Sequence, residues 1–122
     1  MRDVEHAMQA AFVRWTSVCR IPEIELSHAV PNGGQRSKAT AGRLKAEGVK
    51  PGVPDWQWPV ARGGYIGLAI EFKSPGEGPT KEQRDRINAL QMAGWLAVLC
   101  WDWEAASRVV KGYAGMIKLE FS

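Results

Sequence analysis

Three charged residues near the middle of the chain, Asp55, Glu71 and Lys73, are of the types that hold a metal ion and act on a phosphate. Side chains alternate along a strand, so Glu71 and Lys73 lie on one face of the predicted strand and Phe72 on the other. Neighbouring carboxylates repel each other unless a cation lies between them, and Mg²⁺ takes carboxylate oxygen ligands. The pattern therefore indicates a divalent metal site if Asp55 lies beside Glu71. Glu-x-Lys by itself is better explained by a polar strand end, because so short a motif often occurs by chance.

A predicted hairpin would bring Asp55 to Glu71 across the fifteen residues that separate them. Residues 55–60 predict a short strand, Gly63-Gly64 predicts a turn, and residues 65–73 predict a second strand. Antiparallel or bulged pairing places the start of the first strand beside the end of the second. The segment 49–54 contains two prolines and a glycine, so it predicts a loop that leads into Asp55.

The rest of the pattern predicts an α/β fold, with a mixed central sheet flanked by helices in the order α-β-α-β-β-α-β-α. Apolar residues at three- and four-residue steps indicate helices, and alternation or short apolar runs indicate strands. Besides the hairpin, the predicted elements are a helix over 3–19, a strand over 24–30, a helix over 37–47, a helix from Thr80 to about Ala93, a strand over 95–100 and a helix over 104–114. Thr80 and Gln83 form a capping box, in which both side chains satisfy free backbone donors at the helix start.

Length and composition favour one globular domain spanning residues 1–122, because a domain typically has roughly 150 residues. The longest apolar run, residues 95–101, is far shorter than the roughly 20 residues of a membrane-spanning helix. The N-terminus has no compact apolar stretch of the signal-peptide type. Cys19 and Cys100 have no metal-ligand spacing, which favours free thiols in a reducing compartment. We therefore expect a cytoplasmic protein without a membrane partner.

The net charge of +3 is concentrated in one segment. Residues 33–50 have five cations and one acid, a local excess of +4, so the rest of the chain is slightly negative. The five cations are Arg36, Lys38, Arg43, Lys45 and Lys50. Such a cluster is typical either of a solvated helix face or of a surface that contacts a polyanion such as DNA.

The same residues carry a resemblance to a known family. Gly52-Val53-Pro54-Asp55, followed by Glu71-Phe72-Lys73 and then by Thr80-x-x-Gln83, resembles the VRR-NUC group of the PD-(D/E)xK nucleases. The resemblance covers nearly the whole chain. It implies a restriction-endonuclease-like fold and hydrolysis of DNA phosphodiester bonds with Mg²⁺ or Mn²⁺. It also implies kinship with Holliday-junction resolvases, a branched DNA substrate in replication, recombination or repair, and a homodimer.

By matching position, the resemblance implies a role for each residue of the site. Asp55, Glu71 and the backbone carbonyl of Phe72 would be metal ligands, and Lys73 would orient water or offset charge on the phosphate. Gln83 would help to hold the site, although its capping-box role explains it nearly as well. Glu5 matches an acid on the first helix of many members and is the fourth candidate ligand, with an ordinary surface glutamate as the alternative.

Two other functions remain open on the sequence alone. The protein could bind DNA junctions without cutting them, and the intact Asp, Glu and Lys set argues against that. Alternatively, its tryptophans could form a protein-interaction surface. Trp56 and Trp58 alternate after Asp55, so stacking on bases is a minority interpretation beside the core or a dimer interface.

Overall fold

A computed structural model describes residues 2–31 and 37–118 and shows a mixed four-stranded sheet. The strands lie in the order β1 (His28–Ala29), β2 (Trp56–Trp58), β3 (Leu68–Phe72) and β4 (Leu96–Cys100). β1, β2 and β3 pair antiparallel, and β4 pairs parallel with β3. The predicted α/β fold class is therefore confirmed, including the hairpin and the strand over 95–100.

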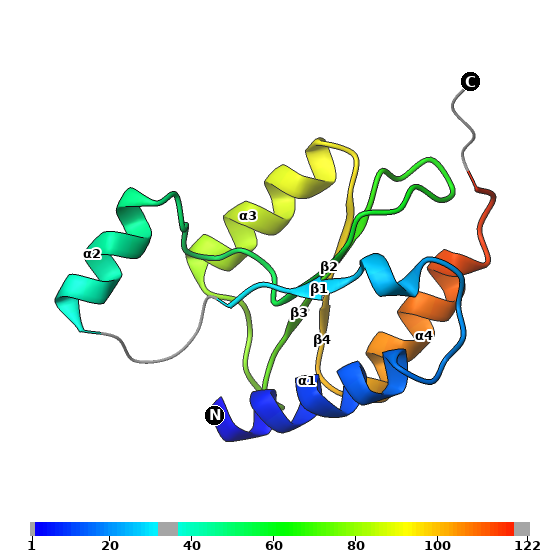
Figure 1. The fold of residues 1–122 in the computed structure, drawn as a ribbon, viewed down its shortest axis with the longest axis horizontal. Coiled ribbons are helices and arrows are strands. Elements are labelled where there is room, and N and C mark those ends of the chain that lie inside the picture. Colours follow the sequence, from blue (N-terminus) through cyan, green and yellow to red (C-terminus); the bar gives the residue numbers. More distant parts are fainter. Residues whose placement is uncertain (1, 32–36, 119–122) are drawn as a thin grey trace.

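Helices cover both faces of this sheet (Figure 1). α1 (Arg2–Thr16) and α4 (Trp103–Ala114) pack together on one face, and α3 (Lys81–Met92) packs against β4 on the other. α2 (Lys38–Ala46) stands apart from the sheet on the far left of Figure 1 and has no buried residue. Within residues 2–31 and 37–118, no helix is long and apolar enough to span a membrane.

The larger core lies between the sheet and the α1–α4 layer. Phe12 of α1 is fully buried, with its ring centroid 4.9 Å from that of Trp56 and 5.4 Å from that of Phe72. Trp58 is also fully buried, and its indole N–H donates to the carbonyl of Glu23 at 2.8 Å. Base stacking by Trp56 and Trp58 is therefore excluded in this fold, because neither ring is accessible.

The opposite face of the sheet is packed with smaller residues. Ala69 of β3 and Ala97 of β4 are buried against Ile87 of α3. Since side chains alternate along β3, the residues that follow Ala69 on this face are Glu71 and Lys73. The α3 face of the sheet is thus apolar at its centre and charged at the end of β3.

One predicted strand, residues 24–30, is largely wrong. Ile24–Leu26 is a short 3₁₀ helix, and only His28–Ala29 pairs with β2. Glu23 has a left-handed backbone with φ of 69° and forms an ion pair with Arg62 at 3.0 Å. These contacts with residues far along the chain decide the local structure, and a seven-residue alternation carries no sign of them. The two predicted free thiols are confirmed.

Candidate active site

The β2–β3 hairpin brings Asp55 to the end of β3. Trp56 pairs with Ile70 in antiparallel register, so Asp55, one residue before Trp56, lies next to Glu71. The Asp55 Oδ2 atom accepts the backbone N–H of Phe72 at 2.8 Å. On its other side, the carbonyl of Asp55 accepts the backbone N–H of Val30 at 2.8 Å. Asp55 is therefore held by its neighbours on both sides, as the predicted pairing requires.

Glu71 and Lys73 are buried at the end of β3, where they are only 3% and 6% exposed. β4 lies alongside both residues: Glu71 pairs with Leu99, and the Lys73 N–H donates to the carbonyl of Cys100 at 3.0 Å. Phe72, between them, points into the opposite core, as alternation predicts. Burying an acid and a base in this way is costly unless other polar groups contact them.

Gln83 of α3 supplies that contact, and it does so from within a capping box. Its Nε2 atom donates to Glu71 Oε2 at 3.0 Å, while its Oε1 atom accepts from Lys73 Nζ at 3.2 Å. The same Oε1 accepts the backbone N–H of Thr80 at 2.9 Å, and the Thr80 hydroxyl accepts the Gln83 N–H. The two sequence interpretations of Gln83 are therefore not alternatives. One amide caps the helix and joins the acid to the base.

A glycine allows the loop before Asp55 to pack against the start of α3. Gly52 has a φ of +79°, and a Cβ atom there would lie 2.5 Å from the backbone carbonyl of Glu82. A side chain at this position is excluded both by its backbone conformation and by the contact. This close approach holds the loop that carries Asp55 against the helical turn that carries Gln83.

Glu5 of α1 lies beside the site and forms its own contacts. Its Oε2 atom accepts the backbone N–H of Ser74 at 3.2 Å and the Ser74 hydroxyl at 3.0 Å. The charge of Glu5 also raises the pKa of both Asp55 and Glu71. Over the part of the chain that the structure describes, no three Asp, Glu, His or Cys side chains are grouped so that they could hold a metal ion together. Glu5 is thus an electrostatic neighbour of the two carboxylates.

The two carboxylates strongly perturb each other. Burial, the charge of Asp55 and a hydrogen bond with Asp55 raise the pKa of Glu71 to about 9. Burial also raises the pKa of Asp55, against the lowering effect of the Phe72 N–H. Glu71 Oε1 is buried and has no hydrogen-bond partner among the described residues. Two buried carboxylates with an oxygen left unpaired fit a hard divalent cation, which takes one or two carboxylates together with water and phosphate oxygens.

The raised pKa of Glu71 predicts a pH-dependent stability in metal-free protein. The pKa in the folded state, about 9, lies above the ordinary value of 4.5, so the fold favours the protonated form of Glu71. The stability that this preference contributes is complete below about pH 4.5, decreases as the pH rises and is lost as the pH passes through about 9. Glu71→Gln keeps the shape of the side chain but replaces the carboxyl group with an amide that cannot ionise. We expect its free energy of unfolding at pH 8 to exceed that of the wild type by up to about 5 kcal/mol, the energy of a shift from 4.5 toward 9 evaluated at that pH.

Urea unfolding in EDTA across pH 5–9 measures this effect. Glu25→Gln, an exposed change of the same kind, is the control and should follow the wild type. Parallel pH curves for the wild type and Glu71→Gln would contradict the assigned pKa.

Four of the five predicted DNA-contacting cations lie within the described residues. Lys38, Arg43 and Lys45 lie on α2 and Lys50 follows it, whereas Arg36 lies outside the described residues.

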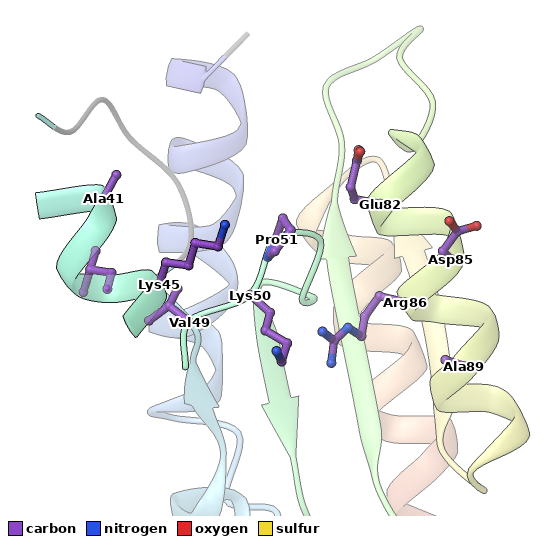
Figure 2. A pocket seen from close by; sticks show the side chains of 10 residues that line it. Ala41, Lys45, Val49, Lys50, Pro51, Glu82, Asp85, Arg86 and Ala89 are labelled. Carbon is purple, nitrogen blue, oxygen red and sulfur yellow. The ribbon is translucent and has the colours of Figure 1, made fainter. Parts of the chain in front are cut away.

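α2 and α3 form the walls of a groove of about 870 Å³, which Lys45 and Lys50 line (Figure 2). Arg86 of α3 also enters this groove, although it lies outside the basic segment 33–50 that the sequence pattern singled out. Its spacing of three residues from Gln83 was the available signal, since such residues share a helix face.

Comparisons with known proteins test the fold and the resemblance. No protein-family model and no curated protein matches the sequence. A solved structure described as a "VRR_NUC domain protein" matches with a TM-score of 0.83 and 27% sequence identity, over 96% of this chain and 93% of the other. The structural match therefore extends over nearly the whole chain. The resemblance seen in the sequence motifs is confirmed, because this chain is similar over nearly its whole length to a VRR-NUC domain protein.

Proposed function

We propose that this protein is a metal-dependent DNA endonuclease that hydrolyses phosphodiester bonds. The observation that carries the proposal is the buried pair Asp55 and Glu71, joined to Lys73 through Gln83. Structural packing alone does not explain it, because burial raises the pKa of both carboxylates and the charge of Asp55 raises that of Glu71 further, which destabilises the fold at neutral pH. Perturbed acids in such a cluster are typical of functional sites. The VRR-NUC fold of the matched structure supports a nuclease in general.

Asp55, Glu71 and the backbone carbonyl of Phe72 are the groups that would hold Mg²⁺ or Mn²⁺. When bound, such an ion lowers the pKa of its water and polarises the phosphoryl oxygens. The positive charge of the ion would then offset the burial and the neighbouring negative charge that raise the pKa values of Asp55 and Glu71. Glu5 adds negative charge beside them and anchors Ser74, so we assign it to positioning and charge rather than to the central ligand pair.

Lys73 has a separate role. Its ammonium group has three N–H donors, of which one is directed to Gln83 Oε1. The others can orient the attacking water or contact the phosphoryl oxygens, where negative charge grows during the reaction. A cation held in place before the reaction stabilises that charge without reorganisation. Gln83 fixes the direction of the ammonium group because Thr80 and Glu71 hold the Gln83 amide.

The substrate that we propose is branched DNA, cut by a homodimer. Arg36, Lys38, Arg43, Lys45 and Lys50 supply the positive charge that binds a phosphate backbone. A chain of 122 residues offers little surface for a four-way junction. Two copies related by a two-fold axis would match a symmetric junction with two equivalent cleavage sites.

A panel of labelled linear, forked, flapped and four-way DNAs tests this function. Incubation with Mg²⁺ or Mn²⁺ should produce nicks that EDTA abolishes, and these should form faster on the branched substrates. Salt-sensitive binding without cleavage on every substrate would instead favour a DNA-junction-binding module. Absence of both would overturn the assignment to DNA.

A further inference from the structure

Two cations from different segments converge in the groove between α2 and α3. Lys50 lies in the loop that leads to Asp55, and Arg86 lies on α3. Figure 2 shows the Lys50 ammonium group and the Arg86 guanidinium group turned toward each other. Across residues 2–31 and 37–118, neither side chain has an ion-pair or hydrogen-bond partner. The fold therefore directs two cations without acidic partners into the same groove, where a bound anion would interact favourably with both.

The two acids that line the same groove do not neutralise these cations. Asp85 is bound by Lys81 at 2.9 Å. In Figure 2 the carboxylates of Glu82 and Asp85 point away from the place where Lys50 and Arg86 meet. The groove lining also includes the apolar residues Leu44, Val49 and Ala89. An anion bound there would interact with both cations more strongly than in open water, because apolar walls lower the local dielectric constant.

This pair of cations is attached to the same two segments that build the candidate active site. Lys50 precedes Asp55 by five residues, and Gly52 between them packs on the first turn of α3. Arg86 follows Gln83 by three residues, a rise of about 4.5 Å along the helix. An anion between Lys50 and Arg86 would therefore be held by the same loop and the same helix that place Asp55 and Gln83.

We propose that Lys50 and Arg86 together bind one backbone phosphate of the DNA, next to the phosphate that is cut. This inference rests on the proposed function and adds Arg86 to its substrate-binding residues. The planar guanidinium group of Arg86 binds two phosphate oxygens at once, while Lys50 acts as a point charge. The contact positions the strand and carries no sequence preference, because it reaches only the backbone.

The test measures binding of a fluorescent four-way DNA junction over a range of salt concentrations, in the Asp55→Asn background so that cleavage does not interfere. We expect Arg86→Ala to weaken binding about tenfold and to reduce the slope of log affinity against log salt by about 0.9. Arg84→Ala removes the same charge from an exposed position of α3 that does not line the groove. This control should change the affinity by about twofold or less.

A double-mutant cycle tests whether Lys50 and Arg86 share one phosphate. If they do, the double variant Lys50→Ala with Arg86→Ala loses clearly less affinity than the product of the two single losses. Losses that multiply fully would contradict a shared phosphate. Arg86→Lys should retain part of the affinity, since it keeps the charge and loses the two-pronged contact.

Cleavage kinetics in the otherwise wild-type protein separate binding from chemistry. Arg86→Ala should raise KM about tenfold and leave kcat within about twofold, because the lost contact is made equally before and during the reaction. If Arg86→Ala matches Arg84→Ala in salt slope and KM while the wild type cuts DNA, the proposal that Lys50 and Arg86 bind a backbone phosphate is wrong. If the wild type cuts nothing and Arg86→Ala still lowers the salt slope, phosphate binding by Arg86 is supported and the endonuclease assignment fails.

Discussion

Asp55→Asn should reduce the rate of DNA cleavage with Mg²⁺ or Mn²⁺ by about a thousandfold or more, since the reaction loses a charged metal ligand. Asparagine retains an oxygen that can accept the Phe72 N–H, which Asp55 Oδ2 accepts at 2.8 Å in the wild type. The hairpin should therefore keep its register. Single-turnover cleavage of a labelled branched DNA measures the rate, and a thermal melt checks the fold.

The reason for this large effect is that Asp55 contributes charge at a buried position. Replacing it with a neutral amide leaves Glu71 as the one acid of the central pair, and it removes a cause of the raised pKa of Glu71. Calorimetric titration with Mn²⁺ should show weaker binding, whereas DNA affinity should stay equal or rise because a negative charge has gone.

Glu104→Gln is the matched control for Asp55→Asn. It removes one negative charge from an exposed position in the first turn of α4. We expect its cleavage rate to equal that of the wild type. Wild-type cleavage by Asp55→Asn would remove Asp55 from the metal site and with it the proposed mechanism.

Lys73→Met should lower kcat by about a hundred- to a thousandfold, the range that follows loss of one prepositioned group facing developing charge. Methionine retains much of the length of the lysine stem and its apolar contacts, so the buried position stays filled. The variant loses the donor to Gln83 Oε1, which keeps the Thr80 N–H at 2.9 Å. The helix cap is thus preserved while the cation beside the carboxylates is removed.

A second measurement distinguishes this role of Lys73 from a purely structural one. The charge of Lys73 lowers the pKa of Glu71 and of Asp55, so its removal should raise both values further. We therefore expect Mg²⁺ binding near pH 9, where Glu71 of the wild type is about half protonated, to release more protons from Lys73→Met than from the wild type, visible as a buffer-dependent heat.

Lys81→Met is the control for Lys73→Met. Lys81 lies on α3, its side chain is 76% exposed, and it pairs with Asp85 rather than with the site. Its replacement should leave kcat unchanged. If Lys73→Met cleaves DNA as fast as Lys81→Met does, Lys73 is a structural residue of the strand end.

Local periodicity explains why much of the site could be predicted. An alternating strand requires Glu71 and Lys73 to share a face and Phe72 to enter the core, and the structure has them so. The capping box at Thr80 and Gln83 is likewise a short-range pattern, formed by residues three apart. The approach of Asp55 to Glu71 followed from hairpin pairing, which a short connection and a single register limit strongly.

The segment 24–30 shows where periodicity fails. Its alternating apolar residues predicted a strand, but Ile24–Leu26 forms a 3₁₀ helix. Glu23 at its start is held by the indole of Trp58 and the guanidinium of Arg62, which lie more than thirty residues further along the chain. Such contacts override a weak local preference, because strand formation depends on the neighbours that a segment meets.

The sequence by itself determined the strand faces, the helix caps, the basic segment and the resemblance to the VRR-NUC group. Tertiary structure decided that Gln83 joins Glu71 to Lys73, that the pKa of Glu71 rises to about 9, and that Arg86 meets Lys50 in one groove. The physical reason is the range of each interaction. Backbone geometry sets faces and caps within a few residues, whereas burial and charge at the site depend on how the hairpin and α3 pack together.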